Sequence, residues 1–154
     1  MGDLASSVAG LWATLAAGHN VADHVFGQTD WQAARKGAPS AAEVADGVSP
    51  RRGWVACLAH VTQYHLVLGV LLTVVWAVID LPLGWVGVSA GLAVSAGTHA
   101  LLDRRWPVIW LLEHTGKAQF ARLSTGGING PYTADQALHG LALFSAALLM
   151  AALS

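Results

Sequence analysis

Four long apolar stretches, each polar at only one end, constrain this chain more than any other feature of its sequence. The first and third stretches, residues 4–27 and 85–104, become polar at their last residues. The second and fourth, 53–79 and 134–153, are polar at their first residues. Stretches of this kind are typical of transmembrane helices, and because consecutive crossings run in opposite directions, the four polar ends lie at one depth. We therefore expect an all-α fold, an integral membrane bundle of about four transmembrane helices.

The basic residues are confined to two segments. All eight Lys and Arg residues lie within 28–53 or 104–132, the connections that follow the first and third helices. Four crossings place both connections on the same side of the membrane, and the positive-inside rule makes that side cytoplasmic. Because the Ala- and Gly-rich composition is typical of bacteria, the sequence predicts a multi-pass protein of the bacterial inner (cytoplasmic) membrane with both termini outside.

The overall composition limits the classes of partner. With 55% hydrophobic and 11% charged residues, the chain is far from an ordinary soluble surface, and the lipid bilayer is its expected surrounding. A net charge of −1 offers no basic surface to a nucleic-acid backbone, so nucleic-acid binding is disfavoured. We interpret residues 1–154 as a single transmembrane helical domain, whose oligomeric state the sequence leaves open.

The connection between the third and fourth helices contains a further element. Pro107 opens a short apolar run, which predicts a helix over about 107–115 that lies along the membrane interface. The run 124–131 is rich in Ser, Thr, Gly and Asn and predicts a loop. Thr133 followed by Gln136 fits a capping box that opens the last helix.

Ionisable residues gather at the polar ends of the four helices. Three helices contain a His and an Asp four residues apart, and residues at this spacing share one helix face. The pairs are His19/Asp23, His99/Asp103 and Asp135/His139, and the remaining helix contributes His60. Because ionisable groups near hydrocarbon cost several kcal/mol unless they are paired or ligated, their convergence at one depth indicates a functional site.

The residue types in this cluster favour a divalent metal. Imidazole and carboxylate together suit Zn²⁺, Mn²⁺ or Fe²⁺ better than Ca²⁺ or Mg²⁺, and zinc is our first expectation. The candidate ligands are His19, Asp23, His60, His99, Asp103, Asp135 and His139. They exceed one tetrahedral site, which leaves either a two-metal centre or one metal backed by Asp–His pairs. A hydrogen-bonded Asp–His network that joins the helices without a metal is the alternative.

The third helix carries a ridge of small residues that leads to its His–Asp pair. Gly87, Gly91 and Ser95 precede His99 and Asp103 at intervals of four residues. Small residues at this spacing let membrane helices pack closely. We therefore expect the ridge to turn His99 and Asp103 into the bundle rather than toward lipid.

Three cations of the second connection are candidates for binding a substrate. Arg104 and Arg105 directly follow Asp103, and Lys117 lies in the same connection. These cations are placed to hold an anionic group such as phosphate against the metal. The alternative interpretation is that they set the topology and contact lipid headgroups.

The pattern of site residues resembles a family of small bacterial and phage multi-pass membrane proteins of unknown function. The pattern comprises Gly18–His24, Gln28, Trp31, Lys36, His60, His99, Asp103, Asp135, Gln136 and His139. The stretches 28–32 and 115–123 are similar to its actinobacterial and actinophage branch. More loosely, the chain is similar to inner-membrane proteins labelled metal-dependent hydrolases. The resemblance implies the same candidate ligands but no established substrate.

These observations lead to two functional hypotheses. The first is a membrane-embedded, metal-dependent hydrolase that acts on an ester or phosphoester, such as a phospholipid, at the cytoplasmic leaflet, with Asp103 or Asp135 as the general base. The second is a non-catalytic phage or host membrane protein that modulates another membrane protein and uses the Asp–His network structurally. Metal or proton transport is disfavoured because the second helix beyond His65 and the fourth beyond His139 are apolar.

Overall fold

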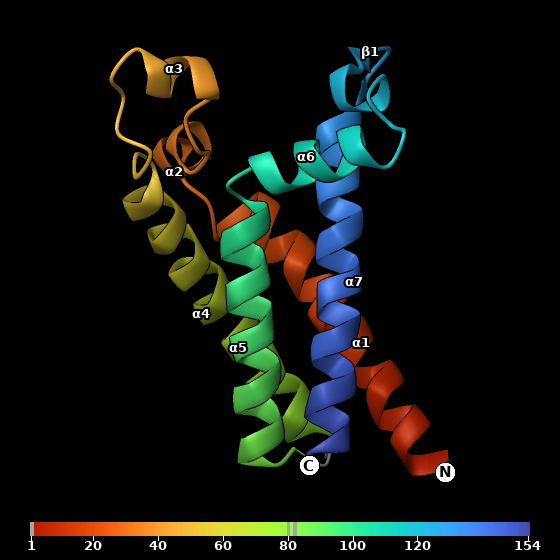
Figure 1. Ribbon diagram of the computed structural model, residues 1–154. Helices are drawn as coiled ribbons and strands as arrows, with labels where there is room; N and C mark the ends of the chain where they lie inside the picture. Colours follow the sequence, from red (N-terminus) through yellow and green to blue (C-terminus); the bar gives the residue numbers. More distant parts are fainter. Residues whose placement is uncertain (1, 80, 82) are drawn as a thin grey trace.

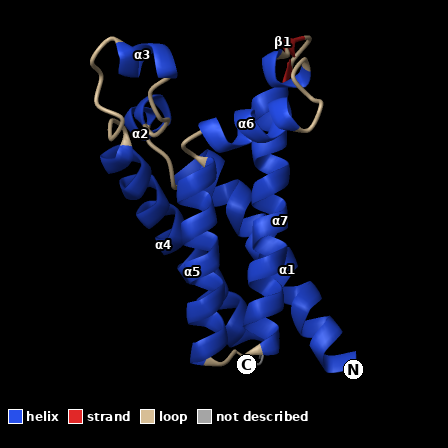
Figure 2. Cartoon of the chain, viewed as in Figure 1, coloured by secondary structure: helices blue, strands red, loops and turns tan. Residues whose placement is uncertain are grey.

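The computed structural model describes residues 2–79, 81 and 83–154, and most of them lie in helices (Figure 2). The long helices are α1 (Gly2–Val21), α4 (Trp54–Ile79), α5 (Trp85–Leu102) and α7 (Gly130–Ala152). Figure 1 shows both termini at one end of the bundle and the short elements at the other, with α1 crossing behind α7. The predicted helical bundle is confirmed, and the connections after α1 and α5 lie at the same end.

Three of the long helices are sufficiently long and apolar to cross a membrane. They are Trp54–Ile79, Trp85–Leu102 and Gly130–Ala152. The fourth, α1, has 20 residues but is not among the candidate spans found in the described part of the chain. Polar side chains such as Thr14, His19 and Asn20 lower its mean hydropathy. The prediction of about four membrane-spanning helices therefore holds for three.

The predicted first helix, 4–27, changes geometry before it ends. Its last turn is the π-helix η1 (Ala22–Phe26), a type of turn that is frequent at functional sites. The chain leaves η1 so tightly that a Cβ at Gly27 would lie 2.0 Å from the Ala22 carbonyl oxygen, so only glycine fits. This turn orients the Asp23 side chain and the Gly27 carbonyl, both of which reach the candidate site.

The last helix begins at Gly130 rather than near residue 134. The predicted capping box of Thr133 and Gln136 is wrong, because Asn129 is the N-cap and its Oδ1 accepts the Tyr132 backbone N–H at 3.0 Å. The Thr133 hydroxyl donates instead to the Asn129 carbonyl at 2.9 Å. The earlier start leaves the Gln136 side chain free to face the interior of the bundle.

The predicted loop 124–131 contains a small hairpin. Its strands are β1 (Ser124–Thr125) and β2 (Ile128–Asn129), paired antiparallel. Gly126 and Gly127 form the turn with φ angles of 59° and 78°, which the favoured two-residue hairpin turn requires. Apart from these strands, the described chain is all-α as expected.

Short helices cover the end of the bundle opposite the termini. The connection after α1 folds into α2 (Asp30–Arg35) and α3 (Ala41–Ala45), each opened by a capping box that the sequence analysis did not use. The predicted short helix is confirmed as α6 (Trp106–His114), which lies across the end of the bundle in Figure 1. A 3₁₀ turn, η2 (Phe120–Arg122), follows it.

The half of the bundle nearest the termini is apolar and closely packed. Its fully buried side chains include Leu11, Leu15, Leu68, Ala146 and Met150. The predicted ridge of α5 is confirmed, because Gly87, Gly91, Ser95 and His99 are its buried residues. A Cβ at Gly87 would lie 2.5 Å from the Met150 carbonyl oxygen, so α5 and α7 approach through the glycines. The ridge thereby turns His99 into the bundle.

Candidate metal centre

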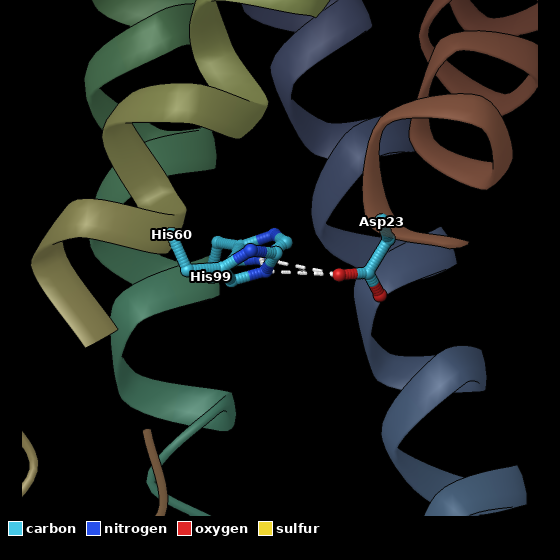
Figure 3. Close-up of side chains that lie close together, drawn as sticks. All are labelled: Asp23, His60 and His99. Carbon is cyan, nitrogen blue, oxygen red and sulfur yellow. Dashed lines mark hydrogen bonds and ion pairs between the residues drawn. The ribbon is translucent and has the colours of Figure 1, made fainter. Parts of the chain in front are cut away.

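Two imidazoles and one carboxylate meet where η1, α4 and α5 come together. The His60 Nε2 atom lies 2.9 Å from Asp23 Oδ1 and 3.0 Å from His99 Nε2. His99 Nε2 lies 3.9 Å from the same Asp23 oxygen. Figure 3 shows the side chains of His60 and His99 pointing toward the Asp23 carboxylate from their two helices. All three side chains are buried, so their charges must be balanced locally.

A hydrogen bond to a backbone carbonyl determines which nitrogen of His60 carries the proton. The His60 Nδ1–H donates to the Gly27 carbonyl oxygen at 2.8 Å. In the neutral ring, Nε2 then carries no proton, and its lone pair points at Asp23 and His99. The His60 lone pair and the Asp23 oxygen, 2.9 Å apart, repel each other, so a cation beside them is stabilising. An imidazole fixed through its other nitrogen is also the usual arrangement of a metal-bound histidine.

A second carboxylate reaches the same two imidazoles. Asp103 Oδ2 lies 3.3 Å from His60 Nε2 and 3.3 Å from His99 Nε2. A tetrahedral zinc ion with bonds of about 2.0–2.1 Å holds its ligand atoms about 3.3 Å apart. Asp23 Oδ1 and Asp103 Oδ2 are both buried without a hydrogen-bond partner among the described residues. The donor types and spacings therefore fit a divalent ion.

His139 on α7 forms a second, overlapping group with His99 and Asp103. One ligand atom from each of these residues lies within 4.8 Å of the others. The His139 Nδ1–H donates to the Asp135 carbonyl at 2.9 Å, and Nδ1 is 3.4 Å from Asp135 Oδ2. His139 Nε2 is buried and has no hydrogen-bond partner within the described chain. Asp135 therefore stands behind the imidazole rather than beside the other candidate ligands.

His19 belongs to neither group. Its Nε2 lies 3.0 Å from Gln136 Oε1 and therefore donates to it, so its Nδ1 accepts from the Tyr64 hydroxyl at 3.2 Å. The Gln136 amide nitrogen donates in turn to Asp135 Oδ2 at 3.3 Å. The structure thus places His19, predicted as a ligand, in a hydrogen-bonded layer beside the two groups.

Lys36 is a buried cation that the sequence analysis did not assign to the site. Its Nζ atom lies 2.9 Å from Asp103 Oδ1 and 3.7 Å from Asp23 Oδ1. An opposite charge at these distances favours the ionised form of both carboxyls.

A cavity of about 470 Å³ adjoins the candidate ligands. Asp23, Asp103, Asp135, Gln136, Lys36 and Arg105 contribute its polar lining. Val108, Ile109 and Pro131 contribute apolar surface. The volume and the mixture of polar and apolar walls are those of a small-molecule site. The cavity brings three of the candidate ligands, the carboxylates of Asp23, Asp103 and Asp135, within reach of a substrate, whereas none of the candidate histidines lines it.

The three predicted substrate-binding cations differ in position. Arg105 lines the cavity. Arg104 is buried and donates to the carbonyls of Lys36 and Arg52 at 2.8 and 2.6 Å, with its guanidinium 4.7 Å from the centre of the Trp54 ring. Lys117 is exposed and is not part of the cavity lining. Arg104 thus joins two backbone segments, and Lys36, rather than Lys117, lies at the site.

Comparison of the chain with protein-family models, with curated proteins and with solved structures finds no match. The geometry of the site is therefore the basis for a functional proposal.

Proposed function

We propose that this chain is a membrane-embedded protein that binds a divalent metal, and that it uses the metal to hydrolyse an ester or phosphoester. The observation that carries the proposal is the convergence of His60 Nε2, Asp23 Oδ1, Asp103 Oδ2 and the His139 imidazole on His99 beside a cavity. Because these acceptors are buried, binding a cation between them is more favourable than leaving them unpaired. Zinc suits the imidazole and carboxylate set, and manganese or iron would also fit.

The candidate ligands divide into two groups that share His99. His60 and His99 with Asp23 form the first, and His99 with Asp103 and His139 form the second. When bound, a divalent ion supplies a more acidic water molecule and polarises an ester oxygen. Because a neutral imidazole offers one lone pair, the sharing of His99 favours a single ion in the proposed site.

The cavity residues have separate tasks in this proposal. Asp135 lies in the cavity wall and is partly exposed, so it can take up a proton there. Asp103, the other proposed base, is more deeply buried and holds Lys36 through Oδ1. Lys36 and Arg105 can bind and orient an anionic group of the substrate. We therefore assign the general base to Asp135 in preference to Asp103.

We further propose that α1 is a fourth span and that the site lies in the cytoplasmic leaflet of a bacterial inner membrane. The connections after α1 and α5, which contain every Lys and Arg of the chain, lie at the site end of the bundle. The positive-inside rule makes that end cytoplasmic, with both termini outside. A phospholipid is then an accessible phosphoester substrate.

A competing function is that of a non-catalytic membrane protein held together by an Asp–His–Lys network. The observation in its favour is Lys36, which already supplies a positive charge to Asp103 and Asp23. In this case the buried charges stabilise the helix packing without a metal. The two functions differ in what removal of metal changes.

The test is hydrolysis by purified protein after chelation and after reloading with Zn²⁺. A fluorogenic phosphodiester and a phospholipid in mixed micelles serve as substrates. We expect activity only in the metal-loaded protein, and a loss of about 10²–10⁴-fold in Asp135→Asn. Asp46→Asn, which changes an exposed carboxylate, is the matched control and should keep full activity. No hydrolysis in either state, or no metal bound at all, supports the structural network instead, and equal activity with and without metal contradicts the metal-dependent mechanism.

A further inference from the structure

A second cavity of about 630 Å³ lies beside the first, with Arg105 in the wall between them. None of the candidate metal ligands lines it. Small residues leave the space: Ala34, Gly37, Ala38, Gly53 and Ala56. The cavity is therefore formed by α2, the segment that follows it and the first turn of α4, and its chemistry is separate from that of the metal centre.

The charged lining of this cavity is predominantly positive. Arg35, Arg52 and Arg105 line it, opposed by the single carboxylate of Glu43. Arg52 Nη2 lies 2.6 Å from Glu43 Oε1, and Arg105 Nη2 donates to the Ala33 carbonyl at 3.1 Å. Guanidinium groups retain further N–H donors after one such bond. The cavity thus offers several unfilled donors to an anion of more than one oxygen.

Arg104 holds the two walls of the cavity in place. Its buried guanidinium donates to the Lys36 carbonyl in one wall and to the Arg52 carbonyl in the other, at 2.8 and 2.6 Å. The walls meet so closely at Gly53, whose φ is 89°, that a Cβ there would lie 2.5 Å from the Arg35 carbonyl oxygen. The cavity is consequently a preformed part of the fold, which lowers the cost of ordering on binding.

Arg105 itself is in an unusual conformation. Its φ of 66° is the only positive value for a non-glycine residue in the described part of the chain. A bulky side chain at positive φ is strained by about 1–3 kcal/mol, and such strain clusters at ligand-binding positions. The strained residue lies at the junction of α5 and α6 and lines both cavities.

Apolar side chains adjoin this basic lining. Trp31 and Val55 belong to the cavity wall and are exposed, Val55 by 76%. Val55 is the second residue of α4, a candidate membrane span. Basic pockets at the ends of membrane helices bind the headgroups of anionic lipids. An amphiphile matches both surfaces, with its phosphate on the arginines and its tail on the adjacent apolar side chains.

We propose that this second cavity binds a phosphate group, supplied by the headgroup of an anionic phospholipid. Its recognising residues are Arg35, Arg52 and Arg105, with Glu43 as a competing anion for Arg52. The second cavity shares Arg105 with the proposed hydrolytic site, but it contains no candidate ligand and needs no metal, so binding there can be measured without hydrolysis.

Native mass spectrometry of the full chain in detergent tests the proposal. Phosphatidic acid is titrated against phosphatidylcholine, whose headgroup carries no net charge, and inorganic phosphate is added as a competitor. Arg35→Gln and Arg52→Gln should each weaken binding of phosphatidic acid about fivefold, the effect of one basic residue near an anionic lipid. Glu43→Gln should strengthen binding, because it releases Arg52. Arg51→Gln removes the same charge next to Arg52 but outside the cavity, and should have no effect.

The outcomes separate the possible ligands. Equal weakening by Arg51→Gln and Arg52→Gln shows attraction to the whole loop and overturns the cavity assignment. Equal affinity for the two lipids, with no response to any variant, also overturns it. Displacement of phosphatidic acid by millimolar inorganic phosphate, with the same dependence on Arg35 and Arg52, keeps the phosphate site but assigns it to a soluble anion. Unchanged thermal unfolding of the exposed variants confirms that they remain folded.

Discussion

The two ends of the bundle use the same helices in opposite ways. Near the termini, α1, α4 and α7 meet through fully buried Leu11, Leu15, Leu68 and Met150. At the other end the same helices and α5 bury His60, His99 and His139 with two carboxylates. Burying one large apolar side chain contributes about 1.5–3 kcal/mol to folding. Burying an unpaired charge costs several kcal/mol.

This contrast assigns stability and chemistry to different halves of the molecule. The apolar half needs no ion, and its packing through Gly87 and Gly91 fixes where α5 meets α7. The polar half depends on that fixed geometry, because His99 and His139 come from these two helices. Binding of a metal ion should therefore stabilise the polar half and leave the packing of the apolar half unchanged.

The largest effect is expected from loss of the shared ligand in His99→Ala. Both candidate groups contain His99, so the substitution leaves neither intact. We expect bound zinc, measured by elemental analysis after equilibration with Zn²⁺, to fall from at least one equivalent to near zero. His65→Ala is the matched control, because His65 is bound to Val61 and Ser95 and belongs to neither group. Unchanged zinc in His99→Ala would remove the site assignment.

Lys36→Met tests how the polar half survives without metal. The substitution leaves Asp103 and Asp23 buried without their cation, and breaking a buried ion pair costs about 3–5 kcal/mol. We expect a large fall in the unfolding temperature of the metal-free protein and a partial rescue by Zn²⁺, which replaces the missing charge. The rise in unfolding temperature that Zn²⁺ causes should be larger in Lys36→Met than in the control variant Arg51→Met. A variant as stable as the parent, with no added response to zinc, contradicts this role for Lys36.

The sequence identified the parts of the site that depend on local spacing. His99 and Asp103 share a face with the small ridge because a helix repeats every 3.6 residues, whatever surrounds it. Lys36 could not be found in this way, since its position depends on how α2 turns back from η1. The Thr29/Gln32 capping box marks the start of α2 but does not fix its direction. In the sequence analysis, Lys36 was named only as part of the pattern from which we expected a family resemblance.

The role of His19 also could not be predicted from the spacing of residues in the sequence. Its depth was predicted, yet its hydrogen bond joins it to Gln136, which is 117 residues away. The rotamer of an imidazole depends on the hydrogen-bond partner that it meets in the folded bundle. The residue type and its helix face are therefore insufficient to predict whether the side chain faces the candidate ligands. The prediction that Thr133 caps the last helix was wrong for a related reason. The helix begins earlier, and Asn129 is its N-cap.

Gly91→Leu is a test confined to the apolar half. A Cβ at Gly91 would lie 2.5 Å from Met150 Cγ and 2.9 Å from the Ala146 carbonyl oxygen, whereas a Cβ at Gly97 on the same helix meets nothing within 4 Å. Overpacking of this kind costs about 1–3 kcal/mol. Thermal unfolding should show the loss in Gly91→Leu and not in Gly97→Leu. Zinc bound per folded molecule should stay constant in both, and a loss of zinc in Gly91→Leu without unfolding would show that the halves are coupled.

The smallest effect concerns Glu43, which lies on the surface away from the metal centre. Hydrogen bonds from the Ser40 backbone and then from Arg52 lower the pKa of Glu43 to about 2. Because the folded pKa is the lower one, the cap of α3 is fully stabilised above the ordinary pKa of about 4.5 and loses this contribution as the pH falls toward 2. We expect the Ser40 amide resonance to titrate with a midpoint near 2, and Arg52→Gln to raise that midpoint. The titration should be the same with and without zinc, and a midpoint near 4.5 would show that the Ser40 and Arg52 bonds do not form in solution.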